Sequence, residues 1–330
     1  MSFKIFIASR SYSKYSKETK KYLEDNDCIL EWNERDRPLQ ENDLLETISK
    51  YDGIIVGVDK VTEKVIKKGK KLKVIAKNGV GVDNIDLKAA SEAGICVVNA
   101  PGTNSASVAD LTVALMLALS RQIPIINTMT KSGLWQRKIG SELWKKKVGI
   151  IGTGEIGRGV IKRLKGFECE ILAYDLKKDL DFAKKYDVKY LGLKDLLAES
   201  DYITLHIPIN KYTKNLLDID ELKLMKKTSF LINTSRGGIV NEDTLYQALK
   251  NYEIAGAACD KFLQEPPGYH RLFELENFIA TSYIGAYTYE TNVRTGMMVA
   301  KNLVDVLKGK KPINLVNSIT DKQQNKIKKE

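Results

Sequence analysis

The stretch KVGIIGTGEIGRGVIKRLKG, residues 147–166, contains the pattern that decides the fold. Its apolar start, KVGII, predicts a buried strand, and the glycine-rich GTGEIG leads directly into an amphipathic segment typical of a helix. In such a unit Gly152 makes the tight turn, Gly154 lets the backbone approach a pyrophosphate, and Gly157 lets helix and strand pack closely. Strand, glycines and helix in this order predict a dinucleotide-binding unit.

The residues that follow indicate which dinucleotide is bound. Amide groups at the start of the helix, at Glu155 and Ile156, would face the pyrophosphate. The next apolar run, EILAYD, ends in Asp175, which lies 18 positions after the last glycine. A carboxylate there accepts hydrogen bonds from ribose hydroxyls and repels a 2′-phosphate, so NAD is favoured over NADP. Lys177 and Lys178 follow closely and leave NADP open.

Short apolar runs alternate with charged helical segments on both sides of this unit. This alternation predicts two doubly wound parallel sheets with helices on both faces. The expected strands are KIFIA (4–8), CILEW (28–32), GIIVG (53–57), KVIAKN (73–78), CVVNA (96–100), KVGIIG (147–152), EILAYD (170–175), YITLHI (202–207), SFLINTS (229–235), IAGAACD (254–260) and FIATSY (278–283).

Two long helical segments indicate how the domains are connected. SVADLTVALMLALSRQ (107–122) is either a bridge between domains or a fully buried helix of one domain, and periodicity does not decide between them. ETNVRTGMMVAKNLVDVLKGKKP (290–312) predicts a helix closed by Gly309 and Pro312, and its position indicates a return to the first domain.

We therefore predict an α/β fold of two doubly wound parallel-sheet domains. A Rossmann cofactor domain is inserted in a flavodoxin-like substrate domain. The expected bounds are 101–285 for the cofactor domain, and 1–100 with 286–330 for the substrate domain.

Composition narrows the class of protein. A chain of 330 residues with 43% hydrophobic content can fill two cores, and it has no apolar run of the roughly 18 residues that span a bilayer. The N-terminal MSFKIFIASR leads directly into a strand and does not resemble a secretory signal. Its four cysteines are isolated in apolar segments, which predicts buried thiols and no metal site. We expect a soluble cytoplasmic protein that binds no membrane.

The net charge of +11 raises the question of nucleic acid. Between Asp59 and Lys77 there are eight lysines and two acids, without the arginines and aromatic residues that nucleic-acid-binding surfaces combine. A solvated helix face is therefore expected, and a patch that attracts a small anion is the alternative. No nucleic-acid partner is predicted.

Six further motifs lie along the chain: NGVGVDNID (78–86), VNAPGTNSASVADLTVALMLALSR (98–121), LHIPINKYT (205–213), INTSRGGIVNEDTL (232–245), AACDKFLQEPP (257–267) and ATSYIGAYTYET (280–291). Together they resemble the motifs of the D-isomer-specific 2-hydroxyacid dehydrogenase family, the group that includes the phosphoglycerate dehydrogenases. The resemblance extends from about Asp52 to Asn317. It implies hydride transfer between NAD and a D-2-hydroxy acid or 2-oxo acid.

The resemblance also implies roles for single residues. Backbone amides of the loop Asn78, Gly79, Val80 and Gly81 would hold the substrate carboxylate, and Lys77 would lie near a distal phosphate or phosphonate. A surface lysine is an equal alternative for Lys77. The cofactor would be contacted by His206, Pro208, Thr213, Thr234, Ser235 and Asp260, the last of which would bind the carboxamide of nicotinamide.

Arg236 is a candidate on chemical grounds as well. A 2-oxo acid requires a cation that holds its carboxylate and keto oxygen in one plane, and a guanidinium meets this requirement. Arg236 ends a predicted parallel strand, which is where doubly wound sheets bind ligands. Glu265 matches the family acid that pairs with the catalytic imidazole.

The catalytic position itself departs from the family. The family has Pro-His-Ile-Gly, whereas this chain has Ser282-Tyr283-Ile284-Gly285. A phenol titrates near pH 10 and an imidazole near 6.5, so Tyr283 is a poorer base unless a cation such as Lys261 lowers its pKa. Three hypotheses remain: a 2-oxo acid reductase with Tyr283 as proton donor, a dehydrogenase for an unusual substrate, and an NAD-binding regulator without catalysis. We favour the enzyme, working in the direction of reduction.

A partner is also expected. The segment from Ile123 to Trp144, with Trp135, matches the family arm that contacts a second subunit, and closure of the chain's own core is the alternative. We expect a homodimer. The chain ends soon after the return helix, so no regulatory domain is expected.

Overall fold

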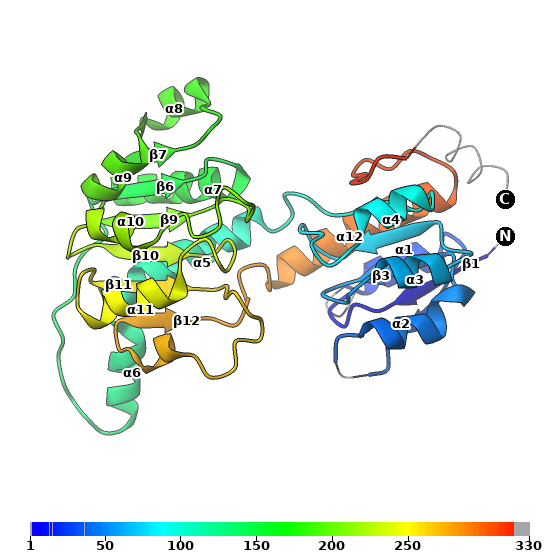
Figure 1. Cartoon of the computed structure of the whole chain (residues 1–330), viewed down its shortest axis with the longest axis horizontal. Helices are drawn as coiled ribbons and strands as arrows, with labels where there is room; N and C mark the ends of the chain where they lie inside the picture. Colours follow the sequence, from blue (N-terminus) through cyan, green and yellow to red (C-terminus); the bar gives the residue numbers. More distant parts are fainter. Residues whose placement is uncertain (1, 13, 15, 36, 320–330) are drawn as a thin grey trace. The chain divides into compact units, whose positions relative to one another are not determined.

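The computed structural model describes residues 2–12, 14, 16–35 and 37–319, which fold into two compact units. Unit 1 comprises the described residues of Met1–Asn104 and Tyr287–Glu330, and unit 2 is the continuous segment Ser105–Ala286. Helix α12, orange in Figure 1, therefore lies in the same unit as the blue N-terminal elements, although it is distant from them in sequence.

Unit 1 is built on a parallel sheet in the order β2-β1-β3-β4-β5, the order of flavodoxin-like folds. Its strands are β1 (Phe3–Ile7), β2 (Cys28–Trp32), β3 (Gly53–Val56), β4 (Val74–Lys77) and β5 (Cys96–Val98). Its helices are α1 (Lys17–Glu24), α2 (Glu41–Thr47), η1 (Ile48–Lys50), α3 (Glu63–Lys68), α4 (Leu87–Glu92) and α12 (Tyr289–Leu307).

Alternation along the strands of unit 1 supplies apolar side chains to both faces of its sheet. Ile54 packs into the core that includes Leu44 of α2, whereas the adjacent Ile55 packs into the core that includes Leu23 of α1 and Leu303 of α12. The C-terminal helix thus returns to cover the first sheet, as its position in the sequence predicted.

Unit 2 contains a seven-stranded parallel sheet in the order β12-β11-β10-β9-β6-β7-β8. Its strands are β6 (Lys147–Ile151), β7 (Glu170–Tyr174), β8 (Val188–Tyr190), β9 (Tyr202–Leu205), β10 (Phe230–Asn233), β11 (Gly256–Cys259) and β12 (Phe278–Ala280). Its helices are α5 (Ser105–Ser120), α6 (Ile123–Lys131), α7 (Glu155–Leu164), η2 (Lys165–Phe167), α8 (Leu180–Tyr186), α9 (Leu193–Glu199), α10 (Ile219–Leu224), α11 (Glu242–Lys250) and η3 (Arg271–Glu274).

The strand order of unit 2 reverses between β6 and β9, as in Rossmann folds, and the fold class predicted from the sequence is confirmed. One face is covered by α5 and α7 and the other by α9, α10 and α11. Helix α5 contributes Ala109, Val113 and Met116 to the core of unit 2, so it is a buried helix of this unit.

Two further findings concern predictions from composition. All four cysteines are buried and free, as predicted. No single helix of the described residues has both the length and the apolar content to cross a membrane, although α5 and α6 together would meet this test across a bend of 63°.

Candidate active site

The three glycines of the turn after β6 have different physical reasons to be glycine. Gly152 has a φ of +97°, and a side chain there would collide with the carbonyl group of His206. A side chain at Gly157 would collide with the carbonyl oxygen of Gly152. At Gly154, by contrast, a Cβ atom would meet nothing within 4 Å. The protein itself therefore requires glycine at the first and third positions, and the second is open for a ligand.

Helix α7 begins at this open position. Its N-cap is Gly154, and no side chain caps it. The side chain of Glu155 lies elsewhere, since its carboxylate accepts a hydrogen bond of 3.1 Å from Ser105 Oγ. Uncapped amides and the positive end of the helix dipole form an anion site. The turn thus fits the pyrophosphate of a dinucleotide.

Asp175 lies directly after β7, next to this turn. Its Oδ2 accepts hydrogen bonds from the backbone amide of Thr153 at 2.6 Å and from Thr153 Oγ1 at 3.0 Å, and its Oδ1 accepts one from the amide of Lys177 at 2.9 Å. Burial raises the pKa of Asp175, but these hydrogen bonds outweigh it and hold the pKa below its usual range. The group is an ionised acceptor at neutral pH, as ribose hydroxyls require.

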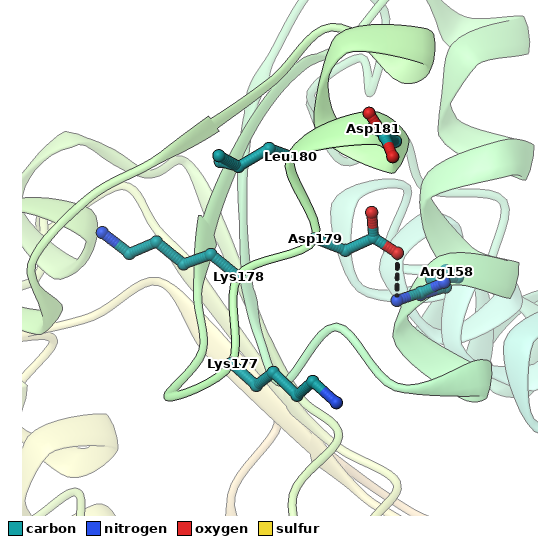
Figure 2. Close-up of a pocket in the computed structure, with 6 residues that line it drawn as sticks. All are labelled: Arg158, Lys177, Lys178, Asp179, Leu180 and Asp181. Carbon is teal, nitrogen blue, oxygen red and sulfur yellow. Dashed lines mark ion pairs between the residues drawn. The ribbon is translucent and has the colours of Figure 1, made fainter.

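An open pocket adjoins Asp175. It is lined by Arg158, Lys177, Lys178, Asp179, Leu180 and Asp181. Figure 2 shows an ion pair between two of these residues, in which Arg158 Nη2 lies 2.8 Å from Asp179 Oδ2. Arg158 also donates to the carbonyl oxygen of Thr153 at 2.9 Å, so its guanidinium supports the glycine turn.

The end of β9 packs against the glycine turn through His206. The ring lies near Thr204, with 3.1 Å between His206 Nε2 and Thr204 Oγ1, and His206 Nδ1 has no hydrogen-bond partner in the described part of the chain. Burial lowers the pKa of His206 to about 3, so the ring is neutral. Further along, Thr213 Oγ1 donates to the carbonyl oxygen of Pro208 at 2.7 Å and closes the loop.

The end of β10 is organised by Asn233, a residue for which the sequence predicted no role. Its Oδ1 accepts hydrogen bonds from the amide and hydroxyl of Ser235 at 3.1 and 2.8 Å, and its Nδ2 donates to the carbonyl oxygen of Arg236 at 2.8 Å. Thr234 Oγ1 lies 3.0 Å from Thr112 Oγ1 of α5. The asparagine stood within the arginine motif, but only the fold shows that it shapes the turn.

Arg236 follows this turn at the carboxyl edge of the sheet. Its Nη1 donates to the carbonyl oxygen of Ser235 at 2.8 Å, and the residue is partly exposed. Gly237 next to it is required, because a side chain there would collide with the backbone of Phe262 and Leu263. The two strand-end loops therefore pack backbone to backbone, which fixes the backbone beside Arg236.

Asp260 and Glu265 lie in the loop after β11. Asp260 is buried, and its carboxylate accepts hydrogen bonds from Thr281 Oγ1 at 2.6 Å and from the amides of Ile284 and Gly285 at 2.8 and 2.9 Å. It therefore fastens the loop that carries position 283. Glu265 is exposed, and its Oε1 accepts a hydrogen bond of 3.2 Å from the amide of Phe262.

Tyr283 is the central residue of the loop that Asp260 holds. Its backbone has a φ of +60°, and 47% of its surface is exposed. The phenol is therefore accessible on unit 2 while its backbone is held by the hydrogen bonds on both sides.

In unit 1 the predicted substrate loop begins directly after β4. Asn78 donates through Nδ2 to Ser9 Oγ at 3.0 Å, which joins the loop to the end of β1. In the described part of the chain, the amides of Val80 and Gly81 donate to no protein group. Gly79 has a φ of +154°, a conformation that favours glycine. Two adjacent open amides suit a carboxylate.

Lys77 has a structural role in unit 1. It is buried at the end of β4, and its ammonium contacts the carbonyl oxygen of Gly57 and lies 2.7 Å from Asn84 Oδ1. These bonds join the ends of β3 and β4 beneath the loop. The geometry thus gives the lysine a function that its position in the sequence did not reveal.

The family model for the NAD-binding domain of D-isomer-specific 2-hydroxyacid dehydrogenases matches residues 113–285. This span includes the glycine turn, Asp175, Arg236 and Tyr283. The chain belongs to the D-isomer-specific 2-hydroxyacid dehydrogenase family. NAD is the cofactor of the matched domain, in agreement with the prediction from Asp175.

Relatives of this dehydrogenase family extend the comparison. The chain is 43% identical to D-3-phosphoglycerate dehydrogenase of Methanocaldococcus jannaschii over 283 residues, which are 84% of this chain and 54% of that one. It is 39% identical to glyoxylate reductase of Thermococcus litoralis, over 83% of this chain and 86% of that one. The chain thus spans about half the length of the phosphoglycerate dehydrogenases that it matches.

Solved structures agree with the fold. D-lactate dehydrogenase from Aquifex aeolicus, complexed with NAD and lactic acid, is 29% identical and matches with a TM-score of 0.83 over 96% of this chain and all of that one. The TT0316 protein from Thermus thermophilus is 32% identical, with a TM-score of 0.88 over 95% of this chain and 99% of that one.

Proposed function

We propose that this protein transfers hydride between NAD and a D-2-hydroxy acid or its 2-oxo acid, with reduction of the oxo acid favoured. The observation that carries the proposal is the turn after β10. Asn233 and Gly237 hold Arg236 there, at the carboxyl edge of the same sheet whose β6 end presents the open Gly154. A protein that only binds NAD would have no need for a fixed guanidinium at this edge.

Each residue has a definite task in this reaction. NADH, when bound, would supply the hydride for the carbonyl carbon. Arg236 binds the carboxylate and the keto oxygen in one plane and stabilises the negative charge that develops on that oxygen. Tyr283 donates its phenolic proton to the same oxygen. Unit 1 is considered by itself: the amides of Val80 and Gly81 would form an anion site that suits a carboxylate, and Lys77 supports their loop.

The proposed cofactor contacts follow from the geometry of unit 2. The start of α7, with Gly154, Glu155 and Ile156, would hold the pyrophosphate, and Asp175 would accept hydrogen bonds from the adenosine ribose. On the nicotinamide side we propose contacts with His206, Pro208, Thr213, Thr234, Ser235 and Asp260. Glu265 would lie at the edge of the reacting centre.

A distal phosphate or phosphonate on the substrate is a narrower form of the proposal. It rests on the position of Lys77, whose ammonium contacts Gly57 and Asn84.

We also propose that the protein is a cytoplasmic homodimer. The free, buried thiols suit a reducing compartment, and the apolar side chains of Trp135 and Ile139 are exposed on unit 2.

The test follows NADH absorbance with purified protein and a panel of 2-oxo acids: pyruvate, glyoxylate, hydroxypyruvate, phosphohydroxypyruvate and phosphonopyruvate. Tyr283→Phe and Tyr283→His are measured beside the wild type. Turnover by the wild type and a loss of about 10²-fold or more in Tyr283→Phe support the phenol as proton donor. Turnover only in Tyr283→His would refute the enzyme and leave an NAD-binding protein that has lost catalysis. Preference for phosphohydroxypyruvate or phosphonopyruvate over pyruvate decides the distal anion.

A further inference from the structure

We propose that Lys261 is a positioning residue for Tyr283. The ammonium of Lys261 stabilises the phenolate of Tyr283, and the two residues together take the place of the usual acid/base in the reaction. This inference deepens the proposed function and rests on it. Lys261 is buried, with 6% of its surface exposed, and its Nζ lies over the ring of Tyr283. A lysine is rarely buried without a charge-related role, because desolvation of its ammonium is costly.

The loops make this contact a fixed one. Lys261 directly follows Asp260, whose carboxylate binds Thr281 on one side of Tyr283 and the amides of Ile284 and Gly285 on the other. The backbone on both sides of the phenol is therefore bonded to the residue next to the lysine. Sequence proximity and the hydrogen bonds of Asp260 together hold the backbone of Lys261 beside the loop of Tyr283.

The electrostatic consequence depends on the charges around the pair. The neighbouring elements carry Arg236 after β10, Asp260 and Glu265 after β11, and Glu242 of α11, which lies 3.0 Å from His270. The carboxylate of Asp260 is bonded to the Tyr283 loop, that of Glu265 to the amide of Phe262, and that of Glu242 to the amide of Leu263. The ammonium of Lys261 contacts the phenol ring.

The chemistry then runs in both directions. In reduction, the carbonyl carbon gains the hydride from NADH, the carbonyl π pair moves to oxygen, and that oxygen takes the phenolic proton. The product is a hydroxy acid, and the phenolate left behind is stabilised by the adjacent ammonium. In oxidation, the phenolate takes the hydroxyl proton while hydride passes to NAD⁺. An unassisted phenol would be protonated at neutral pH and could not begin the second reaction.

The decisive experiment titrates Tyr283 itself. Protein labelled with ¹³C at the tyrosine ζ carbon is followed by NMR from pH 6 to 11, with Tyr283→Phe to identify the signal. We expect Tyr283 to titrate below the ordinary value of about 10 in the wild type and roughly one pH unit or more higher in Lys261→Met. Lys261→Arg should restore the low value, and Lys227→Met removes the same charge from an exposed site as a control.

Kinetics supply the second readout. In Lys261→Met, the pH at half-maximal kcat/KM for oxidation of the hydroxy acid should rise by the same shift, whereas Lys227→Met should leave it unchanged. An unshifted Tyr283 signal in Lys261→Met overturns the role of Lys261, even if the wild type reduces 2-oxo acids. A wild type that reduces none of the panel overturns the proposed function instead. If Lys261→Met does not fold, a wild-type signal at or above 10 overturns the inference by itself.

Discussion

At the scale of the residue, a substitution at Arg236 can separate the effect of the positive charge from the effect of the guanidinium shape. Its guanidinium forms a planar fork held by the turn of Asn233 and Ser235, and a lysine would keep the charge but lose the fork. We expect Arg236→Lys to lower kcat/KM for the preferred 2-oxo acid by about 10²-fold. The affinity for NADH, measured by fluorescence titration, should stay unchanged. A parallel fall in NADH affinity would place Arg236 in the cofactor site and contradict its assignment to substrate.

The burial of His206 predicts how the stability of the fold depends on pH. Burial lowers its pKa to about 3, while an unfolded histidine titrates near 6.5. Between these values the unfolded chain binds a proton that the folded chain does not. The stability contributed by the neutral ring is therefore complete above pH 6.5 and declines as the pH falls toward 3, by about 1.4 kcal/mol per pH unit.

Denaturant unfolding of the wild type and His206→Asn between pH 4 and 7 checks this sign. The free energy of unfolding of the wild type should fall more steeply toward low pH than that of the variant. The two proteins differ only at position 206, so the difference between their curves isolates the contribution of that residue. Parallel curves would show that the ring is accessible to protons in the folded state.

The residue scale also shows what the sequence could and could not predict. The positions of the glycines, Asp175 and Arg236 follow from periodicity and strand ends, because parallel strands place their carboxyl ends at one edge. The partners of long side chains follow from such patterns less reliably. The sequence named Lys261 as a candidate cation for Tyr283, and the two side chains are in contact. The bonds of Lys77 to Gly57 and Asn84, which support a loop, were not predicted.

At the scale of the element, the strand–turn–helix unit offers a matched pair of substitutions. A methyl group at Gly154 meets no protein atom, and its φ of −69° suits alanine, so Gly154→Ala should fold normally. It should weaken NADH binding about tenfold or more, because the methyl group occupies the approach of the pyrophosphate. At Gly157 the methyl group collides with the Gly152 carbonyl, so Gly157→Ala should lose about 1–3 kcal/mol of stability.

Thermal unfolding and NADH titration of both variants separate the two effects. Equal destabilisation of Gly154→Ala and Gly157→Ala would mean that both glycines serve only packing.

The strands themselves could be predicted from the sequence. All eleven expected strands were found, because buried parallel strands are nearly continuous apolar runs. Strand β8 (Val188–Tyr190) was not predicted, since three residues at a sheet edge, two of them polar or aromatic, lack that signal.

At the scale of the whole molecule, the assembly state is the prediction that remains. Helix α6 (Ile123–Lys131) has no buried residue, and the segment after it exposes Trp135 at 83% and Ile139 at 96% of their surface. Such exposed apolar side chains, close together in sequence, are typical of an interface with another chain. The alternative is that Trp135 and Trp144 close the chain's own core, and the exposure of Trp135 conflicts with it.

We expect light scattering to give about twice the chain mass of 37.1 kDa for the wild type, and a single chain mass for Trp135→Arg combined with Ile139→Asp. Ile313→Asp, which changes an exposed apolar residue of unit 1, is the matched control and should stay dimeric. Circular dichroism verifies that each variant is folded. A wild type that has the mass of a single chain at micromolar concentration would contradict the dimer. A double variant that stays dimeric would place the interface outside this segment, because an arginine and an aspartate cannot be desolvated there without partners.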